Sequence, residues 1–309
     1  MPEYRFENRV AIVTGGGRGL GRDHALLLAA RGAQVVVNDL GAEMDGTRRS
    51  AAPADDAVAE IASAGGRALA NYSDISTVDG SRELIEFTLG SLGRVDIVVN
   101  NAGILRDSDV PALRPADWSK VIDVNLGGSF WLTQQAWPFM VGQGYGRIVN
   151  VSSAAGLYGN KGQANYAAAK MGIIGLTQTL ALEGAQYGIL ANAIVPIGLS
   201  RMFRLPDATG IRNETISAAV AWLSHENCSA NGETFWVRRD RLAQAVIGLT
   251  RGLRDPAMTL ESIFENVGQI TDTAEVNFPG LGGRGLCQQR VKGRHEHLRR
   301  VPRLDARRA

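Results

Sequence analysis

The 309-residue chain is 45% hydrophobic and 21% charged, which predicts a globular protein with a large core and excludes a fibre or a wholly disordered chain. Its N-terminal residues show no apolar signal-peptide core, and no run approaches the ~20 apolar residues of a membrane span. We therefore expect a cytoplasmic protein without membrane insertion. Cys228 and Cys287 form no CxxC pair and no metal-ligand pattern, so neither a disulfide framework nor a metal is expected.

The net charge of +2 is unevenly distributed along the chain. Residues 279–309 carry eight Arg and one Lys against Glu296 and Asp305, a net charge of +7, so residues 1–278 carry −5. We predict one folded domain over residues 1–278 and a basic, Gly- and Arg-rich tail over 279–309 that is poorly ordered. Because an Arg run can bind phosphates, a binder of nucleic acid or of an acidic surface that works through this tail is an alternative function. No nucleic-acid partner is expected for the leading function.

The chain begins with the pattern of a dinucleotide-binding unit. A β-branched run, Arg9–Thr14, leads into a glycine cluster and then into the helical pattern Arg22–Arg31. Glycines let the backbone approach a pyrophosphate, and a helix N-terminus offers free N–H groups and a positive dipole end. The candidate cofactor-binding residues of this turn are Gly15, Gly17, Arg18, Gly19, Leu20 and Gly21.

Asp39 follows the second predicted strand, Gln34–Asn38, and lies eighteen residues after Gly21. An acidic side chain at this place accepts hydrogen bonds from the adenosine ribose hydroxyls and repels a 2′-phosphate. The residue therefore favours NAD over NADP. Residues 41–55 then form a connection longer than the usual ~2–6 residues, which is either a mobile surface loop or a functional insertion near the adenosine.

The remaining elements alternate between strands and helices, which predicts a Rossmann-like, doubly wound α/β fold with helices on both faces of a mainly parallel, seven-stranded sheet. Residues 240–278 (with RLAQAVIGLTRGL) are helical in pattern and extend the domain. Further strands are expected at Arg67–Tyr72, Val95–Val99, Gly146–Val151, Leu190–Val195 and Thr234–Val237, and helices at Asp56–Ala64, near Thr77, at Pro115–Gln135 and from about Gln163.

Three residues around this last helix form a candidate catalytic group. Tyr166 and Lys170 are four residues apart, so a helix projects them from one face, and Ser153 follows the fifth strand. A tyrosine with a pKa of ~10 is protonated at neutral pH, but a positive charge ~5 Å away at a dielectric of ~20 contributes ~3 kcal/mol, or roughly two pKa units. We expect Lys170 to lower the pKa of Tyr166 toward neutrality, so that Tyr166 acts as a general acid/base.

These motifs resemble the short-chain dehydrogenase/reductase family. The resemblance implies an NAD-dependent oxidoreductase with a catalytic tetrad of Asn125, Ser153, Tyr166 and Lys170, in which the Asn125 carbonyl holds a water of a proton relay. Alternatively, Asn125 is a polar residue tolerated in a buried helix. Arg18 keeps NADP open as the less favoured cofactor, because a basic residue there is common in NADP-preferring members. The resemblance also assigns cofactor contacts to Asp74, Ile75, Asn101, Ala102, Gly103, Tyr166, Lys170, Pro196 and Ser200.

Two positions leave alternatives open within this resemblance. Asp74 matches the adenine-contacting position, but it could also be the N-cap of the helix near Thr77. Ile197 stands where relatives commonly have Gly, which leaves the backbone path beside the nicotinamide uncertain. Residues 203–219 correspond to the family's substrate lid.

Several segments, including NNAGILRD and GLYGNKGQANYAAAKMGIIGLTQTLALEG, resemble a branch of the family. This branch comprises the (3R)-hydroxyacyl-CoA dehydrogenase domain of the multifunctional β-oxidation enzyme and its stand-alone bacterial relatives. It implies oxidation of a (3R)-3-hydroxyacyl-CoA in fatty-acyl or steroid side-chain breakdown, by a homodimer or homotetramer. The alternatives are a reductase of free ketones such as steroids, and a cofactor-binding scaffold without activity. We expect an apolar substrate pocket for an acyl chain or a ring system, lined by Leu157, Tyr158, Met202, Phe203 and Leu205.

Overall fold

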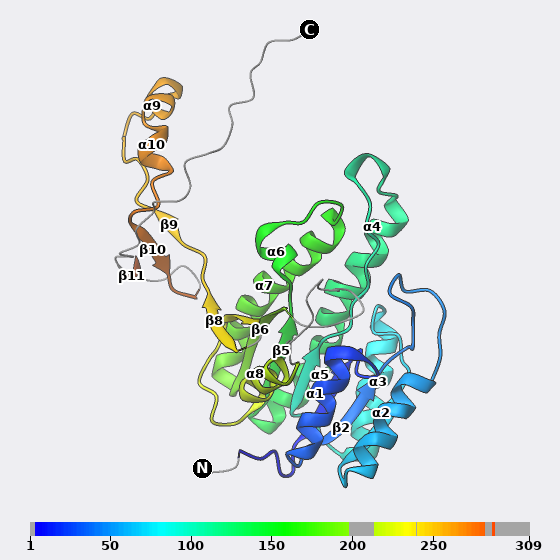
Figure 1. Cartoon of the computed structure of the whole chain (residues 1–309). Helices are drawn as coiled ribbons and strands as arrows, with labels where there is room; N and C mark the ends of the chain where they lie inside the picture. The colour runs from blue at the N-terminus through cyan, green and yellow to red at the C-terminus, as the bar shows by residue number, and fades with distance from the viewer. Residues whose placement is uncertain (1–3, 198–212, 239, 282–285, 288–309) are drawn as a thin grey trace. The chain divides into compact units, whose positions relative to one another are not determined.

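An eight-stranded sheet is the centre of residues 4–245 (Figure 1). The seven strands β1 to β7 are all parallel to one another, and β8 pairs antiparallel with β7. The strand order reverses between β1 and β4, which is the doubly wound Rossmann-like arrangement predicted from the sequence. The spatial order is β3 (Arg67–Asn71), β2 (Gln34–Asn38), β1 (Val10–Thr14), β4 (Ile97–Asn100), β5 (Gly146–Val151), β6 (Ile189–Ile197), β7 (Thr234–Arg238) and β8 (Arg241–Ala245).

The computed structural model describes residues 4–197, 213–238, 240–281 and 286–287. The chain divides into two compact units, Met1–Ala245 and Val246–Ala309. Across the described ranges, no helix has the length and apolar character that crossing a bilayer requires.

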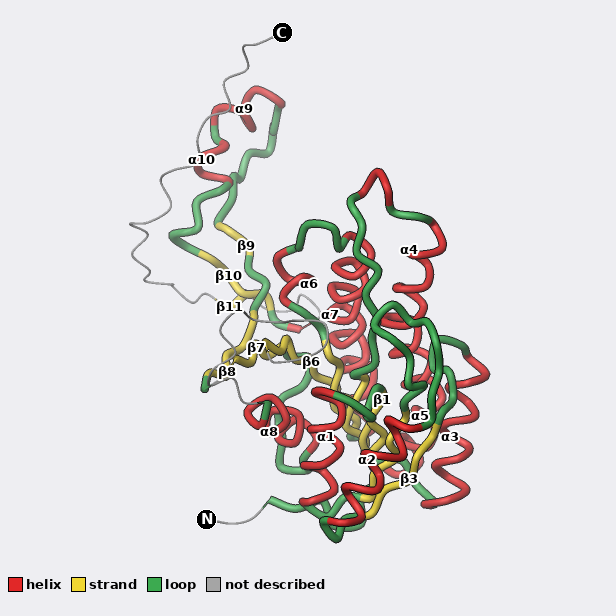
Figure 2. The backbone as a smooth tube through the Cα atoms, turned by 45° about the vertical axis from the view of Figure 1, so that its right-hand side comes forward, coloured by secondary structure: helices red, strands yellow, loops and turns green. Residues whose placement is uncertain are grey.

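Helices cover both faces of the sheet (Figure 2). The central strands are apolar on both sides, because all five residues of β1 and all four of β4 are buried. On one face lie α1 (Gly19–Ala30), α2 (Ala52–Ser63) and α8 (Glu214–Ser224). The other helices are α3 (Val78–Leu92), α4 (Pro115–Ile122), a π-helical turn (Asp123–Gly127), α5 (Gly128–Gln143), α6 (Ala154–Tyr158) and α7 (Ala164–Gly184), with 3₁₀ turns at Val110–Ala112 and Ala185–Tyr187.

The predicted helical pattern beyond residue 240 is wrong at its start. Residues 241–245 form β8, so the sheet has one strand more than the seven predicted. Ala243 lies opposite Trp236 in the ladder, and the Arg241 guanidinium lies 5.9 Å from the Trp236 ring centroid. Pairing with β7 therefore overrides the local helical preference.

The predicted lid is only partly described. Residues 214–219 belong to α8, and its Ile216 is fully buried in the core cluster with β1 and β2. These residues pack on the sheet because Ile216, Val220 and Leu223 repeat at helical spacing. Residues 203–212 lie outside the described ranges.

The second unit contains two short helices and three short strands among its described residues. The strands form an antiparallel sheet in the order β11 (Leu286–Cys287), β10 (Val276–Pro279), β9 (Leu249–Thr250). The helices are α9 (Leu260–Glu265), which Thr259 caps through a hydrogen bond from the Ser262 N–H, and α10 (Val267–Ile270). The predicted domain boundary at residue 278 stays a prediction, and most of the tail lies outside the described residues.

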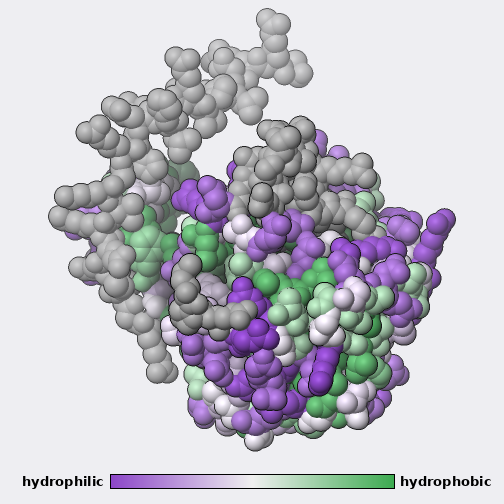
Figure 3. Space-filling model, turned by 60° about the horizontal axis from the view of Figure 1, so that its bottom comes forward, coloured by the Kyte–Doolittle hydropathy of each residue, from purple (hydrophilic) through white to green (hydrophobic). Residues whose placement is uncertain are grey.

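The surface of the chain mixes residue types, as Figure 3 shows for the face turned forward, where hydrophilic residues lie next to hydrophobic ones. Large apolar side chains such as Trp118 and Trp222 are about two-fifths exposed, at 42% and 40%. Scattered apolar residues of this kind are normal on a folded protein.

Candidate active site

One cavity of about 480 Å³ lies where the carboxyl ends of β1, β2, β4, β5 and β6 meet. Open α/β sheets bind ligands at this edge. The cavity brings together residues that the sequence analysis singled out from segments far apart in the chain. They are Gly15, Arg18, Gly19, Leu20, Gly21, Asp39, Asp74, Ile75, Asn101, Ala102, Gly103, Ser153, Tyr166, Lys170 and Pro196, and Ile197 lines it too.

The remaining predicted residues differ in where they fall. Gly17 and Asn125 do not line the cavity. Gly17 is hydrogen-bonded to Asp39 and Asn125 to Ile104, and both of these partners line it. Ser200 falls outside the described residues. Of the predicted apolar pocket residues, Tyr158 lines the cavity, Leu157 does not, and the other three lie outside the described ranges.

The glycine turn after β1 is shaped by close backbone contacts. A Cβ at Gly21 would lie 2.1 Å from the Gly15 carbonyl oxygen, and a Cβ at Gly17 would lie 2.7 Å from the Pro53 carbonyl carbon. Neither position has room for a side chain. The turn therefore places the N-terminus of α1 against the cavity, where it can hold a pyrophosphate.

The Asp39 carboxylate is fixed by two backbone donors. Its Oδ2 accepts the Gly17 N–H at 2.9 Å, and its Oδ1 accepts the Gly41 N–H at 2.7 Å. Each carboxylate oxygen can accept a further hydrogen bond. The side chain is thus oriented before any ligand binds.

Asp74 lies at the end of the β3 segment, on the same side of the cavity. Its Oδ1 accepts hydrogen bonds from the Ser76 N–H and Oγ, and its Oδ2 accepts one from Arg49 Nη2 at 2.6 Å. Burial raises the pKa of Asp74, but these bonds and the charges of Lys120 and Arg49 outweigh it and keep the pKa below its ordinary value. Asp74 is not the helix N-cap, because α3 is capped by the Thr77 side chain.

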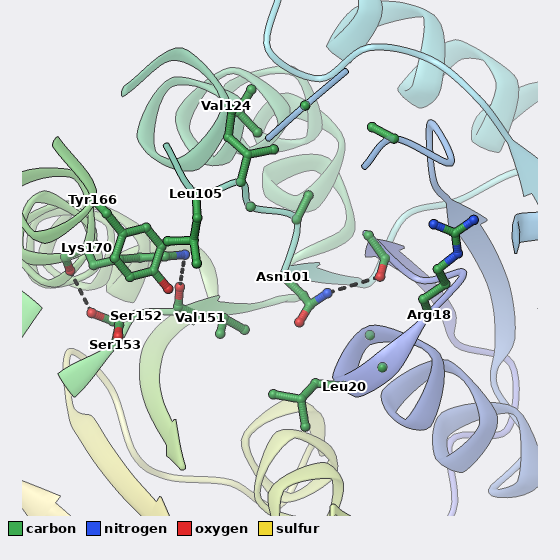
Figure 4. Close-up of a pocket in the computed structure, with 18 of the residues that line it drawn as sticks. Arg18, Leu20, Asn101, Leu105, Val124, Val151, Ser152, Ser153, Tyr166 and Lys170 are labelled. Carbon is green, nitrogen blue, oxygen red and sulfur yellow. Dashed lines mark hydrogen bonds between the residues drawn. The ribbon is translucent and has the colours of Figure 1, made fainter. Parts of the chain in front are cut away.

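Asn101 and Asn125 fasten the segment after β4. Asn101 Nδ2 donates to the Thr14 and Gly15 carbonyls at 2.9 and 3.2 Å, which joins this segment to the glycine turn (Figure 4). Asn125 is fully buried in a π-helical turn, where its side chain exchanges two hydrogen bonds with the Ile104 backbone. Its carbonyl accepts the Ser129 hydroxyl at 3.1 Å, and the predicted water relay stays a prediction.

Ser153, Tyr166 and Lys170 meet at the opposite end of the cavity from Arg18, with Asn101 and Leu20 between (Figure 4). Ser153 follows β5, and its hydroxyl caps α6 by accepting the Ala155 N–H at 3.2 Å. Lys170 Nζ donates to the Val151 carbonyl at 2.7 Å and lies 5.7 Å from the Tyr166 ring centroid. The helix α7 therefore presents a phenol and an ammonium side by side, as the sequence spacing predicts.

The sequence predicts that Lys170 lowers the pKa of Tyr166, and this is wrong for the chain without ligands, in which the pKa of Tyr166 is raised. Burial raises the pKa of Tyr166, the hydrogen bond with Ser153 opposes this, and the Asp107 charge adds to it. Burial also lowers the pKa of Lys170 to about 8. Desolvation disfavours both charged forms, a term that sequence spacing does not contain.

Several residues of the cavity were missed from sequence. Ala42, Glu43, Gly46 and Arg49 come from the long connection after β2, whose length was the only signal. Lys120 comes from α4, while Asn160 and Gln163 precede Tyr166. The Gln163 side chain is held between Asn160 and Asp107, by hydrogen bonds of 3.0 Å to each.

Over the part of the chain that the structure describes, no cluster of three or more His, Cys, Asp or Glu could hold a metal ion. The described cavity residues thus place a phenol and an ammonium at one end and a glycine turn with two carboxylates at the other.

Comparison with known proteins identifies the family. The family model for short chain dehydrogenase matches residues 9–203. Peroxisomal multifunctional enzyme type 2 of Drosophila melanogaster is 45% identical over 287 residues, which cover 90% of this chain and 48% of that protein. A putative short-chain type dehydrogenase/reductase of Mycobacterium tuberculosis is 42% identical over 280 residues, 89% of this chain and 98% of the relative.

Solved structures agree with these matches. A short chain dehydrogenase from Mycobacterium avium has a TM-score of 0.76 at 37% identity, covering 86% of this chain and 97% of that one. The full-length Drosophila multifunctional enzyme has a TM-score of 0.73 at 40% identity, covering 87% and 46%. This chain thus spans about half the length of the Drosophila relative. The chain belongs to the short chain dehydrogenase family, whose members are oxidoreductases that use NAD(P).

Proposed function

We propose that the chain oxidises a (3R)-3-hydroxyacyl-CoA to the 3-oxoacyl-CoA, with NAD as the hydride acceptor. The observation that carries this proposal is that one cavity holds Asp39 together with Ser153, Tyr166 and Lys170. Relatives named peroxisomal hydratase-dehydrogenase-epimerase and 3-oxoacyl-[acyl-carrier-protein] reductase support an acyl thioester with oxygen at C3.

The residues present fit a dinucleotide. The glycine turn at the start of α1 leaves room for a pyrophosphate, and a side chain at Gly21 would overlap the turn itself. The Asp39 carboxylate, held by Gly17 and Gly41, would accept the adenosine ribose hydroxyls. A 2′-phosphate at the same place would be repelled, which supports NAD over NADP, although Arg18 also lines the cavity.

The catalytic group would work by proton transfer. When bound, the nicotinamide supplies the hydride acceptor. Tyr166, as the phenolate, would take the proton of the C3 hydroxyl, and Ser153 would hydrogen-bond the reacting oxygen. Below its pKa of about 8, Lys170 is charged and stabilises the phenolate, while Asn125 would connect it to solvent through the proposed relay.

The test is a panel of substrates followed through NADH absorbance. It contains (3R)- and (3S)-hydroxyacyl-CoA esters of increasing length beside free hydroxysteroids. We expect turnover of the (3R) thioesters and little of the (3S) esters, with affinity rising as each methylene adds ~0.8 kcal/mol of burial. Turnover of free alcohols alone would support the second candidate, a free-ketone reductase, which the likeness to levodione reductase favours (TM-score 0.68, 29% identity).

Assembly and location are also proposals. We propose a homodimer or homotetramer in the cytoplasm, as the sequence analysis expects. Light scattering of the purified chain measures the mass, and a monomer would contradict the proposed assembly.

A further inference from the structure

Residues 41–50 form an insertion loop, and four of them, Ala42, Glu43, Gly46 and Arg49, line the cavity at the carboxyl ends of the strands. The loop closes on itself, since the Ser50 N–H donates to the Leu40 carbonyl at 3.0 Å. It is tied to the segment after β4 by two bonds: the Leu105 N–H donates to the Met44 carbonyl at 2.9 Å, and Arg106 Nε donates to the Asp45 carbonyl at 2.8 Å. The loop is thus held against the segment after β4 and lines the cavity, while its function stays a prediction.

This loop delivers Arg49 to the adenosine end of the cavity. Arg49 lines the cavity and pairs with Asp74 Oδ2 at 2.6 Å, while 65% of its side chain remains exposed. An ion pair with so exposed a partner contributes little to folding. Within the described part of the chain, its other guanidinium N–H groups have no acceptor. Arg49 thus carries spare donors at the wall of the site.

Ile75, which follows Asp74 in the chain, also offers a hydrogen-bond donor. Ile75 lines the same cavity, and its backbone N–H has no acceptor among the described residues. Three residues that line the cavity thus carry complementary groups: Ile75 and Arg49 each have a free donor, and the Asp74 carboxylate, which pairs with Arg49, is an acceptor.

Adenine has the complementary order along one side. Its exocyclic amino group is a donor, and it is flanked by two ring nitrogens, N1 and N7, that are acceptors. We propose that Arg49 is a cofactor-binding residue that donates a hydrogen bond to adenine N7, while Asp74 accepts from the amino group. This inference rests on the proposed dinucleotide cofactor and extends its recognition to a residue of the insertion loop.

The test pairs a ligand change with a residue change. Reduced NAD and its 7-deazaadenine analogue, in which N7 becomes C–H, are titrated by nicotinamide fluorescence against the wild type and Arg49→Met. The wild type should bind the analogue about ten-fold more weakly, the loss typical of one charge-assisted hydrogen bond. Arg49→Met should bind both ligands with equal affinity. A variant that still prefers adenine would overturn the proposal, as would a wild type without preference.

Two controls separate recognition from a structural effect. Arg48→Met changes the adjacent, exposed arginine, which does not line the cavity, and should keep the ten-fold preference. Arg49→Lys should restore part of it. A purely structural role of Arg49 would weaken both ligands by the same factor and leave the ratio unchanged, which also overturns the proposal. Absence of binding of either ligand to the wild type would instead contradict the proposed cofactor.

Discussion

The two ends of the cavity differ in how ready they are for their task. At the adenosine end, Asp39 and Asp74 are held by backbone N–H groups and by Arg49, and the bonds to Asp74 keep its carboxyl ionised. At the end with Ser153, burial raises the pKa of Tyr166 and lowers the pKa of Lys170, so it favours the neutral form of each side chain. The carboxylates at the first end are therefore oriented by bonds within the chain, whereas burial opposes the charged forms of the two side chains at the second end.

The largest expected effect breaks the catalytic end and leaves the binding end intact. Tyr166→Phe removes only the hydroxyl that would transfer the proton, so turnover should fall by at least ~10²-fold while the Kd for NADH stays unchanged. Stopped-flow turnover and fluorescence titration measure the two quantities. Near-normal turnover would remove Tyr166 from the proposed mechanism.

The burial of the Lys170 ammonium should lower the free energy of unfolding. The pKa of Lys170 is lowered from 10.5 to about 8, so between these values the unfolded chain binds more protons and stability rises with pH. In chemical unfolding, the wild type should gain up to about 3 kcal/mol relative to Lys170→Met between pH 8 and 10.5. Below pH 8 the two stability curves should run parallel.

The exposed Lys161 provides the control for this measurement. Lys161→Met should keep the wild-type dependence of stability on pH. If Lys170→Met shows the same slope as the wild type, Lys170 does not carry the desolvation cost.

The difference between the two ends also explains what could be predicted from sequence. The glycine turn and Asp39 were found because backbone geometry and charge restrict which residues can stand there. The spacing of Tyr166 and Lys170 predicted their shared helix face, but the direction of the Tyr166 pKa was wrong, since burial depends on the packed structure. Arg49 could not be separated from Arg48, because only the folded loop shows which of them lines the cavity.

The fold shows the same limit. Buried β-branched runs such as β1 and β4 were located from sequence, because central parallel strands have few alternatives. β8 was predicted as helix, because its sequence has helical preference and its pairing with β7 is a contact that a local pattern does not contain.

A smaller effect concerns the binding end. Asp39→Ala removes the proposed ribose acceptor and the charge that would oppose a 2′-phosphate, so the ratio of the Kd values for NADPH and NADH should fall by about ten-fold. Fluorescence titration of both cofactors gives this ratio. Asp56→Ala, which removes an exposed carboxylate on α2, should leave it unchanged. An unchanged ratio in Asp39→Ala would assign the discrimination to another residue.

The smallest effect adjusts the catalytic end without removing any group of the proposed mechanism. The Asp107 charge raises the pKa of Tyr166, so Asp107→Asn should lower it and move the rising limb of the pH–kcat/KM profile to lower pH, by less than about one unit for a single screened charge. The asparagine oxygen can still accept the hydrogen bond from Gln163 Nε2, so the loop that carries residue 107 keeps this link to the start of α7. Asp109→Asn removes an exposed charge two residues away and should leave the profile in place. A shift of the limb to higher pH in Asp107→Asn would mean that this carboxylate acts on another titrating group than Tyr166.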